Sequence, residues 1–211
     1  MKRSKLIIFL AITIIITIFL LTKGIIVFDH SGERRGEGVY WNDCFYIACS
    51  GQYTEGKTIA KTTDGWRINK VEEDPSNTFI VLRSFLDQYL LVKEDYTIPT
   101  SGEISCVYWN RQFIDNTEFI HAVSDIVDNA TYDFTHNTDG IFQLKDGQNM
   151  RLLCLGYDNC PIATESIGYM GTINGVWCIT TNQPIAEFGK VNCYTIPDEY
   201  TKILSKYLPD N

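Results

Sequence analysis

The longest apolar run in the chain lies near its start. Residues 6–22 (LIIFLAITIIITIFLLT) carry no charge, and apolar residues resume over 24–28 after Lys23. At about 1.5 Å per helical residue, this run is long enough to cross a bilayer if Lys23 reaches the headgroups. The pattern predicts a transmembrane anchor at 6–28, with the lipid bilayer as its partner. A cleaved signal peptide is the alternative, but its apolar core is usually only about 7–15 residues long and ends in small residues.

Positive charges lie close to one end of this run. Lys2, Arg3 and Lys5 precede it, and basic residues beside an apolar segment favour the cytoplasmic side of a membrane. We therefore expect residues 1–5 in the cytoplasm and the C-terminal part outside. This signal-anchor topology predicts a single-pass protein of the cell membrane with an extracytoplasmic domain.

The rest of the chain has the pattern of β-hairpins. Residues 29–37 (DHSGERRGE) are polar and glycine-rich, which predicts a tether before a domain at 38–211. Short runs of aromatic and β-branched residues then alternate with turn residues. Residues 78–83 are apolar on both faces and predict a central strand, and 89–92 predict its returning partner.

One sequence motif occurs twice. The segments 39–45 (VYWNDCF) and 107–113 (VYWNRQF) share five of seven positions, including a tryptophan. This similarity suggests two related hairpins and two related halves, 38–99 and 102–211.

Two segments have helical spacing instead. In 116–130 the apolar residues recur every three or four positions after a capping Asn116 or Thr117, and a second helix is predicted from Pro197 to about Tyr207. The predicted fold class is α+β: mostly antiparallel β-hairpins with two helices packed on the sheet, behind an N-terminal transmembrane helix.

Charge limits the classes of partner. The chain has 18 basic and 26 acidic residues, and four of the basic residues precede residue 29, leaving 14 basic against 26 acidic residues and a net charge of −12. Such a domain is repelled by nucleic acid, which we exclude as a partner. A cationic peptide or protein fits this charge, although a solvated acidic surface is the commoner explanation.

The chain contains seven cysteines, all after residue 29. Cys154 and Cys160 flank a tight loop and are the pair best placed for a disulfide, with buried thiols as the alternative. No C-x-x-C motif is present, so the sequence predicts no zinc site and no cofactor.

The tryptophans lie beside predicted tight turns. Trp41, Trp109 and Trp177 are candidate ligand-binding residues, because a row of exposed rings would form a platform for carbohydrate or peptide. Packing of these rings in the core is the favoured alternative.

No catalytic residue is assigned. His121 and Asp125 are one helical turn apart, Asp133, His136 and Asp139 share a polar loop, and the acidic loop 72–77 has three adjacent carboxylates. Ordinary surface roles explain each group better than catalysis or metal binding. The sequence therefore predicts a non-enzymatic binding or envelope-associated module, and the alternative is an extracytoplasmic hydrolase that uses carboxylates or a Cys/His pair.

Overall fold

The computed structural model describes residues 10, 12–20, 27, 29–131, 134–137, 148–181 and 190–208. The chain divides into two compact units, with the boundary between Thr97 and Ile98. Each unit contains one seven-stranded sheet of antiparallel neighbours and has its own apolar core.

The first unit is built from seven strands in the order β1-β2-β3-β7-β6-β5-β4. These strands are β1 (Glu33–Arg35), β2 (Gly38–Trp41), β3 (Cys44–Ala48), β4 (Glu55–Lys61), β5 (Arg67–Val71), β6 (Phe79–Arg83) and β7 (Gln88–Lys93). The central strand predicted at 78–83 is β6, which is buried at Phe79 to Leu82 and pairs with β7 as predicted.

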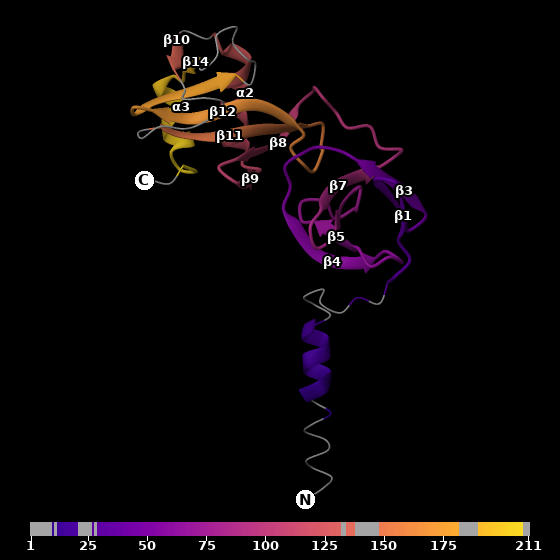
Figure 1. The fold of residues 1–211 in the computed structure, drawn as a ribbon. Coiled ribbons are helices and arrows are strands. Elements are labelled where there is room, and N and C mark those ends of the chain that lie inside the picture. The colour runs from indigo at the N-terminus through magenta and orange to yellow at the C-terminus, as the bar shows by residue number, and fades with distance from the viewer. Residues whose placement is uncertain are drawn as a thin grey trace, which may run out of the picture. The chain divides into compact units, whose positions relative to one another are not determined.

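The sheet of the first unit curls until its two edges meet, and Figure 1 shows its strands arranged in a ring. Gly32 forms a parallel bridge with Thr62, and the Lys61 N–H donates to the Asp29 carbonyl (2.9 Å). Apolar side chains, including those of Val39 and Ile68, pack against one another in its core. The predicted tether thus contributes β1 and one of the bridging residues.

The second unit has the strand order β10-β14-β13-β12-β11-β8-β9. Its strands are β8 (Ile104–Trp109), β9 (Gln112–Ile114), β10 (Phe134–Asn137), β11 (Gln148–Tyr157), β12 (Glu165–Ile173), β13 (Val176–Thr181) and β14 (Lys190–Thr195). Two helices, α2 (Thr117–Asn129) and α3 (Asp198–Leu204), contribute Phe119, Val123 and Leu204 to the core of this unit.

The α+β class predicted from the sequence is wrong. The structure is mostly β, with two sheets and short helices: α2 has 13 residues and α3 has seven. The physical reason is that the first sheet covers its own apolar face by curling, so it needs no helical layer. The two helices predicted at 116–130 and from Pro197 exist, but they belong to the second unit alone.

The prediction of a transmembrane anchor at 6–28 is also contradicted. Among the residues that the structure describes, no helix is both long and apolar enough to cross a membrane. Of the residues described in this stretch, 10 and 12–20 are helical, and a bilayer span requires roughly 20 residues. Residues 1–9, 11, 21–26 and 28 lie outside the described residues. The signal-anchor topology and the predicted membrane localisation depended on this anchor and are contradicted with it. The bilayer as a partner stays a prediction.

The repeated sequence motif forms the same hairpin in both units. In β2–β3, Trp41 pairs with Cys44, and in β8–β9, Trp109 pairs with Gln112 at the equivalent position. Both turns have two consecutive residues with positive φ: Asn42 and Asp43 in the first, and Asn110 and Arg111 in the second. Such turns match the twist of the flanking strands, which explains why the motif specifies a tight hairpin.

Candidate functional site

A cleft of about 370 Å³ opens in the second unit. One wall is the exposed side of α2, a second is the segment that leads into β8, and a third is the turn after β11. Its volume is within the range of pockets that bind small ligands or single side chains.

Helix α2 supplies the first wall because its sequence is amphipathic. Asn116 caps it, accepting a hydrogen bond from the Phe119 N–H (3.0 Å). Phe119 and Val123 are fully buried, so the opposite side of the helix presents Thr117 and His121 to the cleft.

The turn after β11 keeps Asp158 close to Glu103, which directly precedes β8. The Asp158 N–H donates to the Glu103 carbonyl (2.9 Å), and the Glu103 N–H donates to the Asp158 carboxylate (3.1 Å). Gly102 has a φ of +133°, and a Cβ at this position would overlap the Asp158 carboxylate. Asp158 and Asn159 also have positive φ, which closes the turn tightly. These contacts fix the backbone on which both carboxylates are carried.

Acidic groups dominate the electrostatics of the cleft. Glu103, Asp115 and Asp158 line it, together with His121, and none of its lining residues in the described part of the chain is a lysine or arginine. The three acidic residues are exposed, so they remain hydrated and available to a ligand. Within the described residues, no group of three His, Cys, Asp or Glu side chains is arranged to hold a metal ion. The carboxylates of the lining can accept hydrogen bonds from a ligand in the cleft.

Comparison with known proteins adds no identification. No protein-family model matches the chain, and no curated protein or solved structure is detectably similar to it. Function is therefore inferred from the geometry alone.

Two of the three tryptophans predicted to bind a ligand are buried. Trp41 is 7% exposed and its indole N–H donates to the Asp29 carboxylate (2.9 Å). Trp109 is fully buried and its indole N–H donates to the Met170 carbonyl (2.9 Å). In each case the polar edge of the ring is satisfied within the core of its unit.

Trp177 is half-buried and lies against Trp109, with ring centroids 6.2 Å apart. Trp41 belongs to the other unit. The structure thus brings two of the three tryptophans together as neighbours in packing, and their role in ligand binding stays a prediction.

Cys154 and Cys160 are both buried in the second unit. Burial raises the pKa of the Cys154 thiol, and a hydrogen bond with Ser166 opposes this shift. The Cys160 carbonyl accepts a hydrogen bond from the Cys106 thiol (3.6 Å). The disulfide proposed between Cys154 and Cys160 stays a prediction.

The other polar candidates have separate places. His121 faces the cleft, whereas Asp125, its expected partner, is hydrogen-bonded to Tyr200. Asp133 and Asp139 lie outside the described residues, as does the side chain of His136.

The acidic loop 72–77 is organised as a turn. Asp74 is 1% exposed, and its carboxylate accepts hydrogen bonds from the N–H groups of Ser76 (3.0 Å) and Phe79 (2.6 Å). This carboxylate therefore fixes the backbone before β6.

Sequence reasoning found His121 but missed the acidic residues around it. Asp115 precedes α2, whereas Glu103 and Asp158 are more than fifty positions apart in the chain and meet only through the pairing of β8 with β11. The excess of acidic residues was the available signal, and it does not indicate which carboxylates gather.

Proposed function

We propose that this protein is a non-enzymatic binding module whose second unit takes a cationic group of a peptide or protein partner. The observation that carries this proposal is the composition of the cleft. Glu103, Asp115 and Asp158 line it, and among the residues that the structure describes no lysine or arginine does. A concave site lined by charges of one sign concentrates the opposite charge, so it attracts cations and raises their rate of association.

The chemistry of the lining favours an organic cation. A guanidinium or ammonium group carries several N–H donors and is satisfied by acceptors that approach from different directions. Thr117 and Ser124 add hydroxyl groups to the same lining, and Ile120 adds an apolar surface for the aliphatic stem of an arginine or lysine.

The version of the hydrolase alternative that uses a nucleophile paired with histidine lacks a supporting contact. A Cys/His or Ser/His nucleophile requires the base within hydrogen-bonding distance. In the described part of the chain, His121 has no hydrogen bond or ion pair, and the Ser105 hydroxyl donates to the Gly156 carbonyl (3.2 Å). The lining therefore favours binding over nucleophilic chemistry.

The binding of a basic peptide tests this function. We expect Ac-Arg-Arg-Arg-NH2 to bind the full chain in isothermal titration calorimetry, and uncharged Ac-Gln-Gln-Gln-NH2 not to bind. Affinity should fall by at least about tenfold between about 20 mM and 500 mM NaCl, because partly exposed charges are screened by salt.

Substitutions of the lining residues test whether the basic peptide binds in the cleft. Glu103→Gln combined with Asp115→Asn should lower the affinity for the basic peptide roughly tenfold, since both carboxylates line the cleft. The matched control is Glu118→Gln combined with Asp198→Asn, which removes the same charge from exposed positions outside the lining. Equal losses in both double variants would indicate attraction by net charge alone. Affinity that does not change with salt would also contradict the proposal.

A further inference from the structure

The turn between β6 and β7 presents two large apolar side chains to solvent. Phe85 is 98% exposed and Leu86 is 85% exposed. The Ser84 hydroxyl accepts hydrogen bonds from the N–H groups of Leu86 (3.2 Å) and Asp87 (2.9 Å), and the Ser84 N–H donates to the Asp87 carbonyl (2.8 Å). The turn is therefore held in one conformation, which lowers the entropy lost when a partner binds. Adjacent apolar side chains exposed in this way are typical of an interaction surface.

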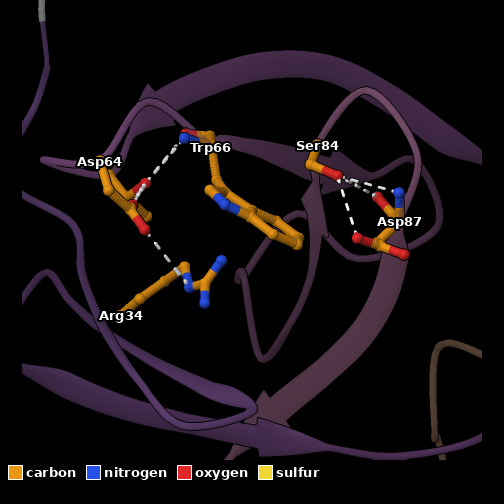
Figure 2. Close-up of polar contacts among 6 residues, drawn as sticks. Arg34, Asp64, Trp66, Ser84 and Asp87 are labelled. Atoms are coloured by element: carbon orange, nitrogen blue, oxygen red, sulfur yellow. Dashed lines mark hydrogen bonds and ion pairs between the residues drawn. The ribbon is translucent and has the colours of Figure 1, made fainter.

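Aromatic rings and a cation lie beside this turn. Tyr89, two residues after Asp87, stacks on Trp66 with ring centroids 6.0 Å apart and planes inclined by 28°. The guanidinium carbon of Arg34 lies 4.2 Å from the centroid of the Trp66 ring. Figure 2 shows the Trp66 ring extending toward the turn formed by Ser84 and Asp87. The set is called the tip surface below and consists of Arg34, Trp66, Phe85, Leu86 and Tyr89.

Buried contacts fix the position of Trp66. Thr62 is 1% exposed, and its hydroxyl accepts a hydrogen bond from the Trp66 N–H (2.8 Å). The Thr62 N–H in turn donates to the Trp66 carbonyl (2.8 Å). The same hydroxyl contacts Asp64, whose carboxylate lies 3.5 Å from Nε of Arg34 (Figure 2). Arg34 is thus oriented from two sides, by the Trp66 ring and by Asp64.

This arrangement leaves hydrogen-bond donors of Arg34 and Trp66 available to a ligand. The Asp64 carboxylate lies 3.5 Å from Nε of Arg34, and the side chain of Arg34 is 33% exposed. Its two terminal amino groups have no acceptor among the residues that the structure describes, and neither does the indole N–H of Trp66. The terminal N–H groups of a guanidinium form a planar fork that matches the two oxygens of a carboxylate.

We propose that the tip surface docks an extended peptide segment of another protein, in which an aspartate or glutamate neighbours apolar residues. The carboxylate binds the open edge of Arg34. The neighbouring apolar side chains pack on Tyr89, Phe85 and Leu86. This surface lies in the first unit, and it is independent of the cationic ligand proposed for the cleft of the second.

The geometry favours a carboxylate-bearing peptide over an anionic membrane surface. Phospholipid headgroups are attracted by clusters of several lysines and arginines. The tip surface has a single cation with Asp64 at its side, which suits the recognition of one carboxylate at one position. The excess of acidic over basic residues in the chain also repels an anionic bilayer.

A pair of matched peptides tests the proposal. The probes are Ac-Phe-Asp-Leu-NH2 and Ac-Phe-Asn-Leu-NH2, titrated into the ¹⁵N-labelled full chain while the four tryptophan indole N–H signals are recorded. Trp66→Phe identifies the signal of Trp66. We expect the Asp peptide to shift this signal saturably and to bind at least about tenfold tighter than the Asn peptide, because only the carboxylate accepts the charged fork.

Variants separate the carboxylate contact from the apolar contact. Arg34→Gln should abolish the discrimination between the two peptides, and Arg34→Lys, which keeps the charge without the fork, should retain only part of it. Phe85→Ser combined with Leu86→Ser should lower the affinity for both peptides to a similar extent. Arg67→Gln is the control, because Arg67 is exposed in the same unit and outside the tip surface. Circular dichroism confirms that each variant is folded.

Three results would overturn the proposal. The first is equal affinity for the two peptides, or no saturable shift with either. The second is a shift confined to a tryptophan other than Trp66. The third is Phe85-dependent sedimentation with phosphatidylserine vesicles in the absence of peptide discrimination, which would assign the tip surface to a lipid surface instead.

Discussion

At the scale of single residues, Asp29 links the segment before β1 to Trp41 in the core of the first unit. Its carboxylate accepts hydrogen bonds from the Ser31 N–H (2.9 Å), the Ser31 hydroxyl (2.6 Å) and the Trp41 indole (2.9 Å). The Ser31 hydroxyl contributes most to lowering the pKa of Asp29 below its ordinary value of 3.8, desolvation opposes the shift, and Trp41 adds to it. A sequence-based assignment of this residue to a tether does not reveal these contacts, because they depend on Trp41.

The lowered pKa of Asp29 predicts a pH-dependent contribution to stability. A carboxylate with a depressed pKa in the folded state stabilises the fold above its unfolded value of 3.8, and this contribution is lost as pH falls through the folded pKa. Asp29→Asn should therefore be less stable than the wild type near neutral pH, and the difference should shrink below that value. Urea denaturation across this range measures it. Asp95→Asn, at an exposed position, serves as the control, and a constant difference at all pH values would contradict the assignment.

At the scale of elements, local patterns are reliable where the contacts are local. The hairpins at 39–45 and 107–113 share a register because their turn residues and alternating side chains lie within a few positions of each other. Helix α2 begins after the predicted cap, Asn116, for the same reason. The periodicity of α2 also predicts which of its faces meets the core.

The cap of α2 gives a direct test. Asn116→Ala removes the side-chain acceptor of the Phe119 N–H, and such losses typically cost about 1 kcal/mol in the free energy of unfolding. Asn129→Ala is the matched control at the other end of the helix, where the Asn129 side chain donates to the Asp125 carbonyl (2.8 Å). We expect the control to change stability by less, since alanine has the higher helix propensity. Equal effects in chemical denaturation would mean that the cap is not what stabilises the first turn.

Contacts between distant elements were not predictable from local patterns. The order of strands in each sheet is set by which apolar faces cover one another after folding, and the sequence specifies this only through the whole set of contacts. The curled first sheet is the clearest case, because 29–32 meet 61–63 through backbone hydrogen bonds that carry no side-chain signature. The cleft depends on the same kind of contact, since Glu103 and Asp158 approach through β8 and β11.

The N-terminal run shows a different cause of error. Its apolar composition predicted a membrane span at 6–28, whereas the described residues contain no helix of the length and apolarity that a span needs. The inferred topology rested on that single feature and was corrected with it.

At the scale of the whole molecule, the two proposed sites have opposite charge preferences and lie in different units. The cleft of the second unit is lined by carboxylates, and the tip surface of the first unit presents an open guanidinium beside exposed apolar side chains. The net charge of the chain by itself would favour cations everywhere. Within the described residues, the carboxylates that line the cleft belong to the second unit, and the guanidinium of Arg34 belongs to the first.

The location of a bound cation tests the central claim most directly. The ¹⁵N-labelled full chain is titrated with Ac-Arg-Arg-Arg-NH2, and backbone amide shifts are assigned along the chain. We predict that saturable shifts concentrate at the lining of the cleft, including Glu103, Thr117, His121 and Ser124. Shifts spread evenly over exposed acidic residues of both units, or confined to the first unit, would contradict a specific cation-binding cleft.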